Sequence, residues 1–264
     1  MARTVFGRPL HDVSAYEIEG LLVDTGCPST AGALVGWARE HGVAQVVLTH
    51  HHEDHVGGAS ALRHQLGLPV LAPALALPRL ARGASIPLYR RLVWGRPRAV
   101  AATALPEVLE HCGRRYRIHH TPGHAFDHVC LFDEERKWLL SGDLFVHERA
   151  LFLRRIEDFD LHLESLRRMH ALGPELLLCA HAGFVEDGAA ALGRKIAFWA
   201  ALGEEVRARG REGWSPREIR DRVLGREGLL TYVSFGDFSK LNLVRACLRS
   251  GTGEAVPASG DGVS

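Results

Sequence analysis

Short apolar stretches separated by turn residues fill the first half of the chain and predict a succession of strands and helices. Apolar residues at 13–23 lie on both sides of Glu19-Gly20, a pair typical of a two-residue β-hairpin. Residues 31–38 carry apolar side chains at helical spacing, with Ser29 in front of them as the expected N-cap. We therefore expect a β-meander followed by a helix.

The same alternation continues through the middle of the chain. Strands are expected at 46–48, 68–72, 116–120, 129–132, 138–140 and 176–179, and helices at 61–66 and 160–171. Strands and helices that alternate, with polar residues directly after the strands, indicate a layered α/β fold.

The last third of the chain carries its apolar residues at helical spacing only. Helices are expected at 196–206, from Ser215 to Val223 and from Ser239 to Leu248, and the second begins with the capping box Ser215-Pro216-Arg217-Glu218. The tail is rich in Gly, Ala and Ser, which predicts disorder. We expect a catalytic domain at 1–190, a helical appendage at 191–250 and a disordered tail at 251–264.

Composition excludes several classes of protein. A formal net charge of +1 over 264 residues gives no global attraction to nucleic acid, and no apolar run reaches about 18 residues, so neither specific nucleic-acid binding nor membrane insertion is expected. The amino terminus lacks the apolar core of a signal peptide, which favours a cytoplasmic protein. Five scattered cysteines do not suggest a disulfide framework. A homodimer is left open.

The densest chemistry lies in THHHEDHVGG at residues 49–58, directly after an expected buried strand. Within it, His50, His52, Asp54 and His55 form the pattern His-x-His-x-Asp-His. Imidazole and carboxylate groups are ligands that suit zinc, iron or manganese. Four ligands this close in sequence are more easily shared between two ions than crowded onto one, so the spacing predicts a dinuclear metal site.

This stretch resembles the signature of the metallo-beta-lactamase superfamily and is especially similar to its glyoxalase II form. The other motifs of that family follow in order: Val23-Asp24-Thr25-Gly26, Thr121-Pro122-Gly123-His124, Ser141-Gly142-Asp143 and Cys179-Ala180-His181-Ala182-Gly183. The resemblance covers roughly residues 13–183. It implies an αβ/βα sandwich, in which two sheets lie between layers of helices, with the helical C-terminal region as an appendage.

The resemblance also implies a role for each site residue. One metal would be bound by His50, His52 and His124, the other by Asp54, His55 and His181, and both by Asp143. Asp24 is implied to support the site through hydrogen bonds, and Asp54 to orient the attacking hydroxide and to pass on its proton. His128 competes with His124 as the candidate metal ligand of this motif. In the family, the residue at the position of His128 belongs to the motif but does not bind metal. Zinc is the expected metal, with iron or manganese as alternatives.

These roles predict a dinuclear hydrolase of a small ester, thioester or lactone, in which a hydroxide between the two metals attacks the carbonyl carbon. The glutathione-binding basic residues of glyoxalase II have no recognisable counterpart here, and Ala182-Gly183 after His181 departs from its usual context. The alternatives are a metal-dependent phosphodiesterase or nuclease, a mononuclear iron dioxygenase acting on persulfides, and a ligand-binding regulator.

Two regions carry local charge. Residues 71–106 contain six arginines and no acidic residue, which predicts either a lid for an anionic substrate or a solvated basic surface, and Tyr89 and Trp94 there would stack on a substrate or pack in the core. Residues 194–249 contain twelve basic and seven acidic residues together with large apolar groups. We expect this C-terminal region to pack on the catalytic domain and to cap the cleft for a small-molecule substrate, with Tyr232 or Phe235 near the mouth.

Overall fold

The computed structural model describes residues 2–5, 8–83 and 86–249, so the predicted disordered tail at 251–264 lies outside the described residues. The strands are β1 Ala2–Val5, β2 Arg8–Asp12, β3 Tyr16–Ile18, β4 Leu21–Val23, β5 Gln45–Val47, β6 Val70–Ala72, β7 Thr103–Ala104, β8 Val108–His111, β9 Arg114–His120, β10 Val129–Asp133, β11 Trp138–Gly142, β12 Leu153–Arg154, β13 Leu176–Cys179, β14 Gly183–Glu186 and β15 Phe238–Ser239. The α-helices are α1 Ala31–Glu40, α2 Glu53–Val56, α3 Ala59–Leu66, α4 Leu77–Arg82, α5 Leu88–Val93, α6 Phe159–His170, α7 Gly188–Arg211, α8 Pro216–Ile219, α9 Leu229–Val233 and α10 Lys240–Arg249. Shorter turns are η1 Pro28–Thr30, η2 Ala74–Ala76 and the π-helical turn η3 Arg220–Leu224.

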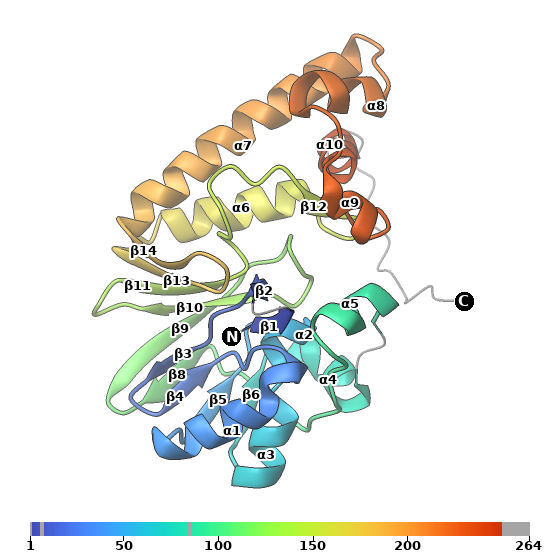
Figure 1. Ribbon diagram of the computed structural model, residues 1–264. Helices are drawn as coiled ribbons and strands as arrows, with labels where there is room; N and C mark the ends of the chain where they lie inside the picture. Colours follow the sequence, from blue (N-terminus) through green and yellow to red (C-terminus); the bar gives the residue numbers. More distant parts are fainter. Residues whose placement is uncertain (1, 6–7, 84–85, 250–264) are drawn as a thin grey trace.

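Two sheets face each other at the centre of the molecule (Figure 1). Within the described ranges, one sheet has the strand order β3-β4-β5-β6-β7 and the other the order β14-β13-β11-β10-β9-β8. Apolar side chains from both sheets, among them Leu21, Val47, Leu131 and Leu140, form a buried cluster between them. Burial of this shared apolar surface holds the two sheets together.

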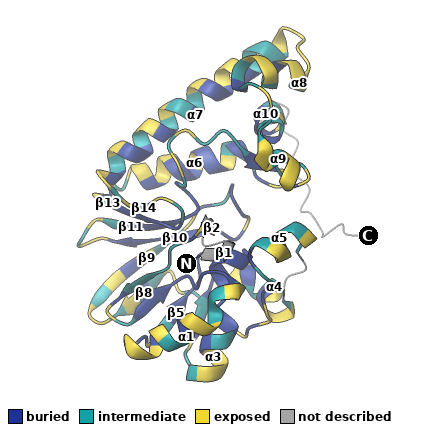
Figure 2. Ribbon diagram, viewed as in Figure 1, coloured by how far each residue is buried: buried dark blue, intermediate teal, exposed yellow. Residues whose placement is uncertain are grey.

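Helices cover the outer face of each sheet, which confirms the expected sandwich. Helices α1 and α3 pack on the first sheet through a cluster that includes Leu34 and Leu62. Helices α6 and α7 lie over the second sheet, where Phe159 stacks on Trp199 with ring centroids 5.2 Å apart. Figure 2 shows buried residues alternating with exposed ones along α6 and α7. The α/β fold class is therefore confirmed.

The amino-terminal elements agree with the sequence except at one helix start. The hairpin between β3 and β4 turns at Glu19 and Gly20, whose φ angles of 54° and 88° are those a two-residue turn requires. Ser29 is not the N-cap of α1, because residues 28–30 form the separate turn η1 and the cap position falls to Thr30. The Thr30 hydroxyl donates backwards to the Cys27 carbonyl instead of capping α1.

The C-terminal helices differ in length from the prediction. Helix α7 has 24 residues and is much longer than the expected 196–206, whereas the capping box at Ser215 and the helix after Ser239 are confirmed. Helix α9 was missed because its five residues are too few to show a helical period. The division at residue 190 stays a prediction, and α6, α7 and α10 share one apolar cluster across it.

Strand β15 was also missed, as were helices α4 and α5 inside residues 71–106. Strand β15 pairs with β12, so Phe238 lies opposite Arg154. In the described part of the chain, no helix has both the length and the apolar character needed to span a bilayer.

Candidate metal centre

The loop after β5 brings four polar side chains into the interior. The strand ends at Val47, the chain turns, and the short helix α2 begins at Glu53, so that Asp54 and His55 lie in the first helical turn. All residues from Val46 to Ser60 are buried. The predicted strand followed by a turn and a helix is confirmed.

Three other loops meet this one at the same edge of the second sheet. His124 follows β9, Asp143 follows β11 and His181 follows β13. Strand β13 runs parallel to β11, and β9 runs in the same direction because β10 is antiparallel to both. The carboxyl ends of these three strands therefore lie together, facing the carboxyl end of β5 from the other sheet.

The seven predicted ligands form two groups, in each of which the candidate ligand atoms lie within 4.8 Å of one another. The first group is His50, His52, His124 and Asp143, and the second is Asp54, His55 and His181.

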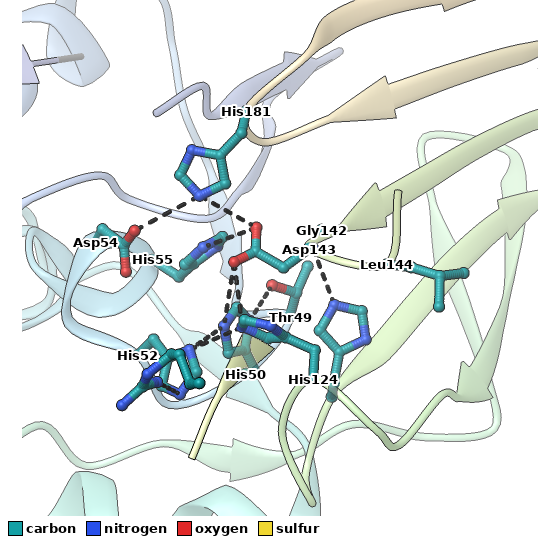
Figure 3. Close-up of polar contacts among 12 residues, drawn as sticks. Thr49, His50, His52, Asp54, His55, His124, Gly142, Asp143, Leu144 and His181 are labelled. Carbon is teal, nitrogen blue, oxygen red and sulfur yellow. Dashed lines mark hydrogen bonds and ion pairs between the residues drawn. The ribbon is translucent and has the colours of Figure 1, made fainter. Parts of the chain in front are cut away.

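Asp143 lies between the two groups (Figure 3). Its Oδ2 atom is 3.2 Å from His124 Nε2 in the first group. Its Oδ1 atom is 3.3 Å from His55 Nε2 and 3.3 Å from His181 Nε2 in the second. One carboxylate oxygen thus faces each group.

These residues fit a pair of divalent cations. His52 Nδ1 is 2.9 Å from His50 Nε2 and 3.0 Å from His124 Nε2, so three ring nitrogens converge on one point. His55 Nε2 and Asp143 Oδ1 are buried and have no hydrogen-bond partner within the described residues. Buried polar atoms without a partner are rare, and these two atoms are of the types that bind divalent cations.

The second ring nitrogen of several histidines is held from outside the centre. His50 Nδ1 lies 3.0 Å from Thr49 Oγ1, and His181 Nδ1 donates to the Asp12 carbonyl at 2.9 Å. His124 Nδ1 is 3.4 Å from Glu157 Oε1. Such contacts fix the ring orientation and the position of the proton. Glu157 was not predicted, because no motif marks it and it lies 33 residues from His124 in sequence.

Asp24 holds the loop together through hydrogen bonds, the role that the resemblance implies. Its Oδ1 accepts the Thr49 backbone N–H at 2.8 Å, and its Oδ2 accepts His55 Nδ1–H at 2.7 Å and the Thr49 hydroxyl at 2.8 Å. Asp24 has a φ of 62°, so its backbone is in the left-handed region. Among the candidate ligands, the Asp24 carboxylate makes its direct contact with His55.

His128 belongs to neither group. Its Nε2 accepts the Asp143 backbone N–H at 3.0 Å, and its Nδ1 lies 2.8 Å from Thr121 Oγ1. Burial, with His124 nearby, lowers the pKa of His128 to about 3, so the ring is neutral. A Cβ at Gly142 would lie 2.7 Å from His128 Nε2, which is why glycine precedes Asp143.

The glycine before His124 is required by the neighbouring helix. A Cβ at Gly123 would lie 2.3 Å from the backbone of His162 in α6, and φ there is 129°. The glycine therefore lets the loop pass against α6.

Carboxylates raise the pKa of three histidines in the centre. Burial would lower the pKa of His55, but Asp143, Asp24 and Asp54 raise it well above its usual value. Burial would lower the pKa of His124, but Glu157 and Asp143 together raise it to about 9. Burial would also lower that of His181, and Asp143 and Asp54 raise it to about 9. Before a cation binds, the His124 and His181 rings are therefore protonated on both nitrogens at neutral pH and carry a positive charge.

Two of the six arginines of residues 71–106, Arg79 and Arg90, turn inwards, so this segment is not simply a solvated basic surface, whereas Arg82, Arg91, Arg96 and Arg98 are exposed. Arg90 is buried and pairs with buried Glu53. Arg79 Nη1 donates to His51 Nε2 at 2.8 Å, and His51 Nδ1 donates in turn to Asp127 Oδ1 at 2.8 Å. Both arginines brace the loop that carries the candidate ligands.

Arg154, which was not predicted, joins the centre to the C-terminal region. Its Nη1 lies 2.9 Å from His52 Nε2 and its Nε donates to Asp237 Oδ2 at 3.3 Å. The Tyr89 hydroxyl also donates to the Asp237 carboxylate. Trp94, the second aromatic residue singled out in residues 71–106, is buried in a small apolar cluster, so it packs in the core.

Helix α7 supports the loop that follows Asp143. Lys195 is fully buried and donates to the carbonyls of Leu144, at 3.2 Å, and Phe145. His162 of α6 donates to the same Leu144 carbonyl at 2.8 Å. Burial lowers the pKa of Lys195 to about 8.

Comparison with known proteins shows the family of the chain. A family model described as the metallo-beta-lactamase superfamily matches residues 9–181. A hydroxyacylglutathione hydrolase of Bdellovibrio bacteriovorus is 29% identical over 167 residues, which cover 58% of this chain and 56% of that protein. Thioesterase pkgB of Emericella nidulans is 30% identical over 157 residues, which cover 58% of this chain and 39% of that protein.

One solved structure is similar in both sequence and fold. The protein TTHA1623 in a di-iron-bound form is 28% identical, with a TM-score of 0.54, and the match covers 67% of this chain and 91% of that one. The chain spans little more than half the length of the hydroxyacylglutathione hydrolase it matches.

Proposed function

Because the chain belongs to the metallo-beta-lactamase superfamily, we propose that it hydrolyses a small ester, thioester or lactone with two divalent cations bound at the candidate metal centre. The observation that carries this proposal is the position of Asp143, which presents one oxygen to each group of candidate ligands. The first cation would be held by His50, His52 and His124, and the second by Asp54, His55 and His181.

Bound cations of this kind supply a hydroxide at neutral pH and a Lewis acid for the substrate carbonyl. The residues of the chain do the rest. Asp24 fixes the His55 tautomer through its 2.7 Å contact, so that Nε2 keeps its lone pair. Asp54 is buried beside the second group, with Oδ2 3.6 Å from His181 Nε2, where it can take the proton of the attacking oxygen and pass it to the leaving group.

A thioester is the substrate class best supported by the relatives, since one is named a hydroxyacylglutathione hydrolase and another a thioesterase. Zinc and iron both suit nitrogen and oxygen ligands without thiolate, and the similar TTHA1623 is described as di-iron-bound. We propose zinc as the native metal and a small molecule as the substrate.

The test combines metal analysis with a substrate screen. The purified protein should contain close to two transition-metal ions per chain and should hydrolyse acyl thioesters or lactones faster than bis(p-nitrophenyl) phosphate. Asp143→Ala should lose most of the metal and the activity. A fully active preparation with one iron per chain that consumes oxygen would favour a dioxygenase, and preferred cleavage of the phosphodiester would favour a nuclease.

A further inference from the structure

The C-terminal region presents an apolar surface to solvent. Leu229, Tyr232, Val233 and Phe235 are 77%, 70%, 54% and 82% exposed. Figure 2 shows α9 as an exposed element beside the buried core. Exposed apolar side chains that cluster in this way usually mark a binding surface. We call these four side chains, together with Leu88 of α5, the apolar face.

Contacts tie this face to α5 of the arginine-rich segment. The rings of Tyr89 and Phe235 have centroids 6.4 Å apart, and the Tyr89 hydroxyl bonds to Asp237. Leu88, the neighbour of Tyr89 at the start of α5, is 68% exposed. Side chains from two segments distant in sequence therefore contribute to one surface.

The apolar face also adjoins the candidate metal centre. Asp237, two residues after Phe235, accepts a hydrogen bond from Arg154 Nε. The Nη1 atom of Arg154 lies 2.9 Å from His52 Nε2. A single side chain, that of Arg154, thus separates the Asp237 turn from a candidate ligand. The apolar face is therefore connected to the candidate metal centre through the contacts of Asp237 with Arg154 and of Arg154 with His52.

The charges around the face favour an anionic partner. Helices α5 and α9 contain no acidic residue, and the Asp237 carboxylate is already paired with Arg154. Arg91 of α5, Arg155 directly after β12 and Arg226 three residues before α9 are exposed. An apolar surface with exposed cations beside it complements a molecule with a hydrocarbon part and an anionic part.

From this arrangement we infer that the apolar face binds the acyl chain of the substrate, so that the preferred substrates are medium-chain acyl thioesters with an anionic thiol portion. The inference rests on the proposed function and narrows it. In the reaction, water adds to the carbonyl carbon, the C–S bond breaks, and one proton goes to sulfur. The products are the acyl carboxylate and the free thiol.

The first experiment measures binding without turnover. Octanoate and acetate are titrated calorimetrically into the metal-loaded protein, because both present the same carboxylate and differ only in the chain. Octanoate should bind at least about tenfold more tightly, as expected for partial burial of its methylene groups. The double variant Tyr232→Ser/Phe235→Asn should lose this difference and leave acetate binding unchanged; asparagine is chosen because φ at 235 is 52°.

The matched control is Trp37→Ser, which removes an exposed aromatic ring on α1, where it stacks on His41. This variant should bind octanoate like the wild type. Leu88→Ser is a second test variant, on α5 rather than α9, and should also weaken octanoate binding. Thermal unfolding of each variant shows whether the fold is kept.

The second experiment compares hydrolysis of acetyl, butyryl and octanoyl thioesters of coenzyme A. The wild type should prefer octanoyl in kcat/KM by about tenfold, and the double variant should lose this preference, whereas Trp37→Ser should keep it. Equal kcat/KM across the series would overturn the inference and leave the proposed function standing. Chain-length-dependent octanoate binding without hydrolysis of any thioester would reject the function instead.

Two other occupants have distinct signatures. A second copy of the chain on this face would make the double variant monomeric in sedimentation while octanoate affinity stayed the same. A lipid surface would make the wild type, but not the variant, co-float with phosphatidylglycerol vesicles, again without a change in octanoate affinity. Either result would overturn the acyl-chain assignment.

Discussion

Arg154 Nη1 lies 2.9 Å from His52 Nε2, on the side of the ring opposite the nitrogen that faces His50 and His124. The guanidinium donates in this contact, so the Nε2 atom accepts. An imidazole that gives Nδ1 to a cation keeps its proton on Nε2, and then both partners are donors. Metal binding must therefore break the contact.

The first prediction follows from that competition. Arg154→Met should bind zinc more tightly than the wild type, by about tenfold, the lower end of the range for contacts that orient a ligand. Competition with a chromogenic chelator measures the change. Arg207→Met is the matched control, because Arg207 contacts Asp160 and the Cys247 carbonyl, and neither of these residues is in a ligand group. Weaker zinc binding by Arg154→Met would mean that the guanidinium supports the loaded site.

A second prediction separates two histidines. His124→Ala should lose about one metal ion per chain and the activity, because a ligand is removed. His128→Ala should keep both metals but lose stability, since it leaves the buried Asp143 N–H without its acceptor, at a cost of about 1–3 kcal/mol. Elemental analysis and thermal unfolding measure the two effects. Equal metal loss in both variants would contradict the assignment.

The third prediction concerns pH. His124 and His181 have pKa values raised to about 9, so a cation that binds at pH 7 must displace a proton from each. Apparent metal affinity should therefore rise with pH to at least about 9, because the pKa of the candidate ligand His55 is also raised well above its usual value. Zinc titrations in buffers of different ionisation enthalpy count the released protons. Glu157→Gln removes one carboxylate beside His124 and should reduce that count, and an unchanged count would argue against the pairing.

A fourth prediction concerns stability at alkaline pH. Burial lowers the pKa of Lys195 from 10.5 to about 8, so between these values the unfolded chain holds a proton that the folded chain does not. The free energy of unfolding of the wild type, relative to Lys195→Met, should therefore rise from pH 8 to 10.5 and be constant below 8, by an amount on the order of 3 kcal/mol. Denaturant titrations across this range measure it, and a flat difference would refute the shift.

The candidate ligands could be predicted from the sequence because their signals are local. His50, His52 and His55 are close together after an apolar strand, and the short motifs of the family resemblance imply His124, Asp143 and His181, each of which follows a strand. A polar residue at a strand end needs no knowledge of its distant partners to be noticed.

The residues that brace the centre could not be predicted in that way. Glu157 and Arg154 act on histidines 33 and 102 residues away, and no periodicity or motif marks either one. Ser29 was misplaced because an N-cap and a short turn before a helix favour the same residue types. Helix α9 has five residues, too few to show a helical period.

Each candidate ligand group draws side chains from both halves of the sandwich. His50, His52, Asp54 and His55 follow β5 of one sheet, whereas His124, Asp143 and His181 follow strands of the other. A cation in either group would thus act as a cross-link between the halves, as a disulfide would. Unlike a disulfide, its contribution depends on the free metal concentration: at a thousand times the dissociation constant, binding adds about 4 kcal/mol to the free energy of unfolding. The lifetime of the folded chain in a cell should then follow metal availability.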